Sequence, residues 1–170
     1  TVHVATLFFV PLMAGVVYLL LRGVEGGAAR VSRIALAPFV LFYAAWEALI
    51  GIGLGLLVDE VNGLSGAEQE TGAELVEEFA DSTVIRVFEL IGTGALIVAL
   101  SAAAIALRRR AGAPLAVPFL LVLAALPIAW HVTPFGQLGL ALFLAAVLLL
   151  IRARPTRGVT THSVASPTTA

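Results

Sequence analysis

The chain has 170 residues, of which 60% are hydrophobic and only 12% are charged, with a formal net charge of -1 and a mean hydropathy of +1.04. A soluble domain is about half apolar and a quarter charged, so this composition excludes an ordinary soluble domain and indicates an integral protein whose main partner is the lipid bilayer. Because cysteine is absent, disulfides, thiolate metal sites and cysteine nucleophiles are excluded as well.

Five segments are apolar enough to be predicted as transmembrane helices, and they give an all-α bundle: 2–21, 34–58, 84–107, 115–130 and 135–151. A helix needs about 20 apolar residues to cross the roughly 30 Å of hydrocarbon in a bilayer. The last two segments are joined by 131-HVTPFGQ-137, whose proline and glycine indicate the turn of a hairpin. One of them could instead be re-entrant, because about 16 residues at 1.5 Å each make a short crossing. Neither a positively charged region nor a cleavage site precedes the first segment, so no signal peptide is predicted.

The ten basic residues are all arginines, and their positions predict the orientation. Nine of them lie in 22–33, 108–110 and 152–157, and five crossings place all nine on the same side of the membrane. Only Arg86 lies toward the other side. Because positive charge is retained in the cytoplasm, we expect the N-terminus outside and the C-terminus inside, in a bacterial inner (plasma) membrane. The arginines are thereby explained as topology anchors, so no nucleic-acid partner is expected.

The outer side carries one sizeable loop, 59–82, with eight carboxylates and no base. Its apolar residues share one helical face while its acidic residues recur at steps of three and four. This pattern predicts an amphipathic helix at about 70–82 that lies over the outer end of the bundle. We interpret the loop as a solvated acidic connector or, alternatively, as a mouth that collects cations. The Thr-, Ser- and Pro-rich segment 152–170 is predicted to be a disordered cytoplasmic tail.

Glu47 is the main candidate for a functional residue, since it lies near the middle of the second segment, in 43-YAAWEALIGIGLGLL-57. An ionisable residue inside a membrane is costly and usually has a role. Tyr43 and Gly51 fall on the same helical face as Glu47. Because small residues allow another helix to approach closely, we expect Glu47 to face protein and not lipid.

A second polar group is predicted on the third segment, where Arg86 and Thr93 lie within about one turn of Glu89. An adjacent arginine favours the charged form of a carboxyl, so we expect Glu89 to be ionised and paired with Arg86. Glu47 has no base within one turn, and burial then favours its neutral form unless Arg86 or His131 reaches it from a neighbouring helix.

Two glycine pairs predict how the second and third segments pack. Gly51 and Gly55 form a small-xxx-small pair on the second segment, and Gly92 and Gly94 lie close together on the third. Small residues let helix backbones approach each other. We therefore expect these two segments to be neighbours, with both carboxyl groups turned inward.

His3 and His131 are predicted at the outer ends of their segments, where two imidazoles could ligate a haem or join carboxylates around a metal ion. Two histidines at helix ends are a weak signal, and we expect no cofactor and no metal site. Walker, zincin and G-x-S-x-G motifs are absent from the sequence, so an enzyme is not expected.

Three interpretations of the function follow, from different classes. The favoured one is binding or transport of a small solute or proton through a polar core around Glu47 and Glu89, in a homo-oligomer, because five segments contain no inverted repeat. The second is an accessory or scaffold subunit that packs its glycine faces against a larger membrane complex. The third is an intramembrane haem or metal protein.

Overall fold

The computed structural model describes residues 2–130 and 134–153, and within those ranges it contains helices and no strand. The prediction of an all-helical protein is therefore confirmed for this part of the chain. The elements are α1 (Val2–Leu20), α2 (Gly27–Pro38), the π-helical turn η1 (Phe39–Tyr43), α3 (Ala44–Glu47), the π-helical turn η2 (Ala48–Gly53), α4 (Leu54–Asn62), α5 (Ala67–Ala80), α6 (Thr83–Arg110), α7 (Ala116–Trp130) and α8 (Phe135–Ala153). His131 and residues 154–170 lie outside the described residues. The predicted disordered tail began at residue 152, but Arg152 and Ala153 belong to α8.

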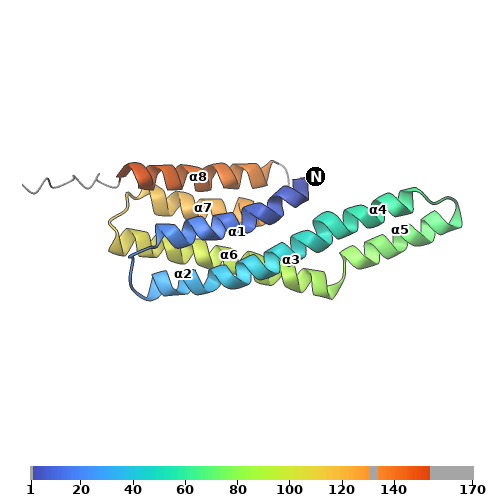
Figure 1. The fold of residues 1–170 in the computed structure, drawn as a ribbon, viewed down its shortest axis with the longest axis horizontal. Helices are drawn as coiled ribbons and strands as arrows, with labels where there is room; N and C mark the ends of the chain where they lie inside the picture. Colours follow the sequence, from blue (N-terminus) through green and yellow to red (C-terminus); the bar gives the residue numbers. More distant parts are fainter. Residues whose placement is uncertain (1, 131–133, 154–170) are drawn as a thin grey trace, which may run out of the picture.

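Several helices are long and apolar enough to cross a membrane, as the composition predicted: His3–Leu20, Gly27–Asn62, Ala67–Arg110 and Phe135–Ala153. The fifth predicted segment is α7, which is apolar but has 15 residues and a length of about 22 Å. It packs along α8, and the stretches α1, α2–α4, α5–α6, α7 and α8 run alternately in opposite directions (Figure 1). The molecule is thus an elongated helical bundle with the features of a membrane protein.

The second helix begins at Gly27 and not at residue 34, so the expected loop 22–33 is only a short turn followed by helix. The turn is closed by Arg33, whose guanidinium donates hydrogen bonds to the carbonyl oxygens of Leu21 and Val24 at 2.6 and 2.9 Å. Both carbonyl groups lie in the turn that follows α1, so the arginine side chain ties this turn to α2.

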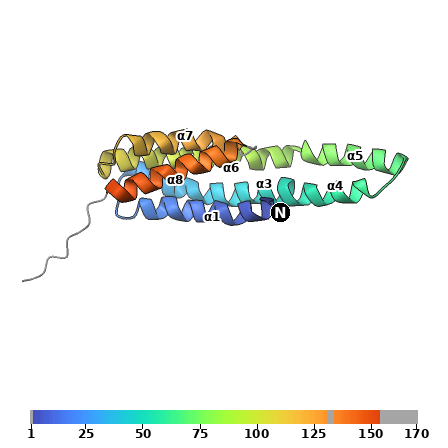
Figure 2. The ribbon, with the colours of Figure 1, turned by 90° about the horizontal axis from the view of Figure 1, so that it is seen from above.

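The second helix also continues further than expected, and with α5 it forms a helical hairpin that projects beyond the bundle (Figures 1 and 2). We call this hairpin, residues 54–80, the acidic arm. The expectation that the acidic helix lies over the end of the bundle is wrong, because α5 packs along α4 instead. Gly72 of α5 is buried against the side chain of Val61, where a Cβ would lie 2.9 Å from a methyl carbon. Ser82 then begins α6 by accepting a hydrogen bond from the Ile85 backbone N–H at 3.4 Å.

The core of the bundle is built around α6, which contacts α2, η1, α3 and α7. Leu96, Leu100 and Leu107 of α6 are at most 1% exposed. Ser32 of α2 is fully buried beside them and donates its hydroxyl to the carbonyl oxygen of Ala99 at 2.8 Å. The half of the bundle that carries the arginines is therefore closed by tightly packed apolar side chains.

Candidate functional site

The second helix departs from regular α-helical geometry on both sides of Glu47. The π-helical turn η1 precedes it and η2 follows it, with the single turn α3 between them. Pro38 lies directly before η1, where its ring nitrogen cannot donate to the preceding turn, and Gly51 and Gly53 lie in η2. Turns of this kind are rare and occur frequently at functional sites, because the additional residue re-orients the side chains around it. The geometry of the helix therefore singles out the region around Glu47.

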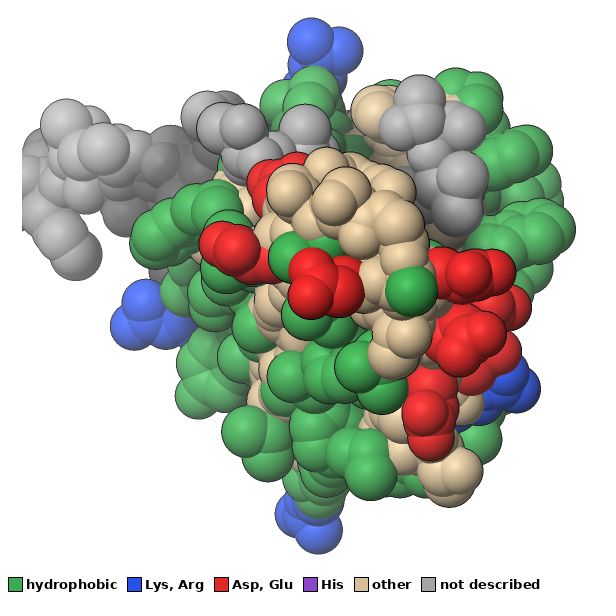
Figure 3. Space-filling view, turned by 90° about the vertical axis from the view of Figure 1, so that its right-hand side faces the viewer, with side chains coloured by type: hydrophobic (Ala, Val, Ile, Leu, Met, Phe, Trp, Pro, Cys, Tyr) green, Lys and Arg blue, Asp and Glu red, His purple; other side chains and the backbone are tan. Residues whose placement is uncertain are grey.

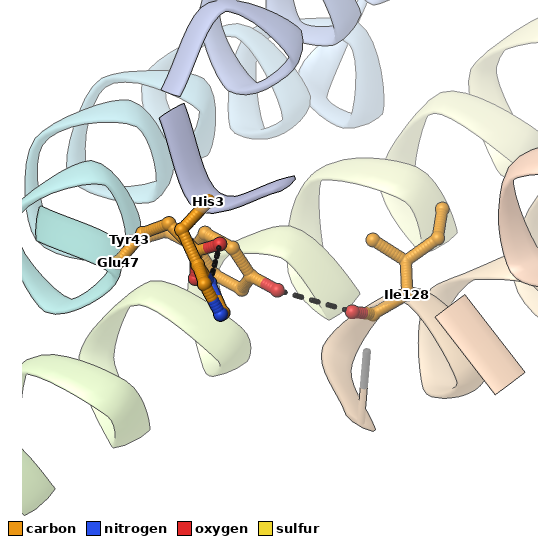
Figure 4. A network of polar contacts seen from close by, with 4 residues as sticks. All are labelled: His3, Tyr43, Glu47 and Ile128. Atoms are coloured by element: carbon orange, nitrogen blue, oxygen red, sulfur yellow. Dashed lines mark hydrogen bonds and ion pairs between the residues drawn. The ribbon is translucent and has the colours of Figure 1, made fainter. Parts of the chain in front are cut away.

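Glu47 is 1% exposed, and its Oε1 lies 3.0 Å from Nδ1 of His3 in the first turn of α1 (Figure 4). The His3 side chain is 42% exposed, so the pair joins a buried carboxyl group to a group within reach of solvent. Gly51, one turn beyond Glu47, makes room for this contact, because a Cβ at Gly51 would overlap the His3 ring. Among the described residues, Glu47 is thus paired with His3, a contact that the sequence did not predict; His131, which was considered as a residue that could reach Glu47, lies outside these residues.

Tyr43, one turn before Glu47, connects three helices. Its ring is 2% exposed, and its hydroxyl donates a hydrogen bond to the carbonyl oxygen of Ile128 in α7 at 3.1 Å (Figure 4). Gly92 of α6 packs directly against the Tyr43 backbone, where a Cβ would lie 2.7 Å from the nitrogen atom. The ring of Trp46 lies edge-on to the Tyr43 ring, with their centroids 5.5 Å apart. These contacts fix the position of the helix turn that carries Glu47.

A cavity of about 530 Å³ lies beside this pair, between α1, η1 and α3, the last turn of α7 and the first turns of α8. Of the residues that the structure describes, its polar lining consists of His3, Thr6, Tyr43, Glu47 and Gln137, and the others in its wall are mainly apolar. A few converging polar groups in a largely apolar wall are typical of small-molecule sites, whose volumes run from about 300 to 1,000 Å³.

Glu47 lies toward one end of the bundle and not at its middle. Its neighbours there are the first turn of α1, through His3, and the first turn of α8, through Gln137 in the same cavity wall. Glu47 is central in the apolar run 34–58, but the helix that contains it extends from Gly27 to Asn62 and outruns α1 and α8. The middle of the long helix is therefore level with the ends of the shorter ones.

The predicted polar set on α6 is arranged differently from the expectation. Glu89 is exposed and does not turn inward with Glu47. Arg86 donates to Asp81 at 2.7 Å in an exposed ion pair, so the prediction that Arg86 pairs with Glu89 is wrong for the described residues. Thr93 is half-buried and is not among the residues that line the cavity.

Only one glycine of each predicted pair lies at a close contact. Gly51 accommodates His3 and Gly92 accommodates Tyr43. At Gly55 and Gly94, no atom of the described residues lies within 4 Å of the point that a Cβ would occupy, so close approach at these two glycines is not found. The second helix and α6 are nevertheless neighbours, because Gly92 of α6 packs against Tyr43 of η1.

From the sequence, His3 was expected only as a possible haem or metal ligand and not as a partner of Glu47, which lies 44 residues away. The one signal in the sequence for this contact was the predicted position of His3 at the outer end of the first helix. Within residues 2–130 and 134–153, His, Asp and Glu side chains form no group of three or more that could hold a metal ion. The bis-histidine haem hypothesis involves His131, which lies outside those ranges.

No protein-family model, curated protein or solved structure matches the chain.

Proposed function

We propose that the chain crosses a bacterial plasma membrane five times, with the N-terminus and the acidic arm outside and the C-terminus inside. The α1–α2 and α6–α7 connections and the end of α8 lie at the same end of the bundle, opposite the arm (Figure 1). That end carries the described arginines at 22–33, at 108–110 and at Arg152, as expected for a cytoplasmic face.

The topology can be tested by labelling single cysteines, because the chain has none of its own. Ser65→Cys lies between α4 and α5, and Ala111→Cys follows α6 at the arginine-bearing end. A membrane-impermeant maleimide should label Ser65→Cys in intact cells and Ala111→Cys only after lysis. The reverse pattern would refute the orientation, and labelling of both in intact cells would refute the number of crossings.

We infer that the protein binds a small amphipathic molecule in the cavity at the outer end of the bundle. The observation that carries this proposal is the buried carboxyl of Glu47, held by His3 at the wall of the 530 Å³ cavity. The apolar wall suits the body of such a molecule, and the converging polar groups suit its head.

Binding is favoured over passage through a continuous polar path. Among the described residues, the buried polar side chains are Ser32 and Glu47, and Ser32 donates to a backbone carbonyl in the core. Between the cavity and the arginine-bearing end lie Val17, Leu21 and Leu100, each at most 1% exposed. The cavity is thus closed on the cytoplasmic side in this conformation, and transport would require a second one.

The experiment is saturation binding to the protein in lipid nanodiscs. Three probes of similar aromatic character are used: the cation tetraphenylphosphonium, the anion tetraphenylborate and the neutral triphenylphosphine oxide. Ala5→Trp fills the cavity, since Ala5 lines it. Leu12→Trp is the matched control, because Leu12 is on the same helix, is 64% exposed and is not a lining residue.

At least one probe should bind the wild type and the Leu12→Trp variant with one site per chain, and should lose that site in Ala5→Trp. The difference between Ala5→Trp and Leu12→Trp nanodiscs removes the contribution of probe dissolved in lipid. Failure of all three probes to bind the wild type, or equal binding to both variants, would refute the proposal.

A further inference from the structure

The outer end of the bundle, where the cavity lies, is strongly acidic. Segment 59–82 has eight carboxylates and no base, and Glu89 is exposed nearby on α6. Figure 3, which views the molecule from the arm end, shows these acidic side chains gathered on that face. Arg86 is the basic residue on this side among the described residues, and Asp81 already neutralises it. One sign of charge around a low-dielectric cleft raises the local concentration of ions of the opposite sign.

The ionisable groups of the cavity favour a positively charged ligand as well. Among the described residues, those that line the cavity and can titrate are His3, Tyr43 and Glu47. The Glu47 carboxyl group, when ionised, supplies a negative charge at the cavity wall, 3.0 Å from the His3 imidazole. Water screens that charge poorly, because Glu47 is 1% exposed and the surrounding wall is largely apolar.

The aromatic lining supplies a second attraction for a cation. Phe9 of α1 and Phe39 and Tyr43 of η1 border the cavity. The face of an aromatic ring attracts a positive charge within about 6 Å, and more strongly where water is excluded. A molecule with an apolar body and a positive charge therefore matches both the apolar wall and the electrostatics of this site.

We propose that the cavity selects lipophilic organic cations, with the Glu47 carboxylate as their counter-ion and the acidic arm as the surface that concentrates them at the outer end. This inference rests on the proposed binding function and names the ligand class of the same site.

The nanodisc binding experiment tests the inference through the ratio of affinities for tetraphenylphosphonium and tetraphenylborate. The wild type should bind the cation on the order of tenfold or more tightly than the anion, after subtraction of the Ala5→Trp signal. Glu47→Gln should remove most of this preference for the cation over the anion. In the variant with Glu74, Glu77 and Glu78 all replaced by Gln, the cation should associate more slowly and with a weaker dependence on salt.

Should Glu47→Gln fail to fold, the preference of the wild type among the three probes still tests the inference. Anion or neutral-probe binding as tight as cation binding would overturn the inference while leaving the proposed binding function intact. The absence of binding by every probe would instead refute the proposed function.

Discussion

Gly92→Ala introduces a methyl group between α6 and η1, at the closest approach of these two helices. The added carbon would lie 2.7 Å from the backbone nitrogen of Tyr43, 2.9 Å from its Cα and 3.0 Å from its Cβ. Ordinary van der Waals contact begins at 3.4 Å, so the helices must separate locally by about 0.7 Å, which is 3.4 minus 2.7. The atoms that must move belong mainly to the backbone, and they cannot rotate away as a flexible side chain can.

Forcing an extra methyl group into a packed interface costs about 1–3 kcal/mol of unfolding free energy. Alanine also favours the helical state over glycine by about 1 kcal/mol, so the net loss in Gly92→Ala is about 0–2 kcal/mol. Gly94→Ala has the same helical gain, and at Gly94 no atom of the described residues lies within 4 Å of the added carbon. The difference between the two variants therefore isolates the packing cost, about 1–3 kcal/mol.

The measurement is thermal unfolding of both purified variants in the same detergent, followed by tryptophan fluorescence. For a chain of this size, 1 kcal/mol corresponds to roughly 2–4 °C, so Gly92→Ala should melt about 2–12 °C below Gly94→Ala. If Gly92→Ala melted at or above the temperature of Gly94→Ala, the close contact between α6 and η1 would not exist in the folded protein.

Three further substitutions test other contacts of the site and the core. Tyr43→Phe removes the hydroxyl that bonds α7 and should lower the unfolding free energy by about 0.5–1.5 kcal/mol in the same melts, with an unchanged melting temperature counting against that bond. Gly51→Ala would displace the His3 ring and should weaken cation binding in nanodiscs, whereas Gly55→Ala should bind as the wild type does; equal binding by both would place His3 away from Gly51. Ser32→Ala removes a buried hydrogen bond to α6 and should cost about 1 kcal/mol, and a melting temperature equal to that of the wild type would argue against it.

The sequence by itself determined that the chain is helical and built for a membrane. Each apolar segment must satisfy its own backbone hydrogen bonds in lipid, and a helix does so using neighbours along the chain. The alternation of apolar segments with arginine clusters and one acidic segment likewise follows from local composition. The sequence also singled out Glu47 and Tyr43, because a carboxyl group inside an apolar run is conspicuous without any knowledge of the fold.

Helix ends were predicted less well than helix existence. The second helix begins at Gly27 and continues to Asn62, past both expected limits, because helical geometry does not stop where hydropathy falls. That extension creates the acidic arm and moves Glu47 from the expected mid-membrane position to the end of the bundle. The π-helical turns around Glu47 were not predicted, since Pro38 and the glycines of η2 are compatible with several local geometries.

The tertiary structure alone decided which residues meet. His3 reaches Glu47 across 44 positions, Arg86 turns to Asp81 and not to Glu89, and the close contacts fall at Gly51 and Gly92. Each outcome depends on the relative height and rotation of neighbouring helices, which are set by packing over the whole interface. The residue pattern of a single helix indicates whether a face is apolar, polar or formed by small residues. Which neighbour that face contacts is decided only when the helices pack against one another.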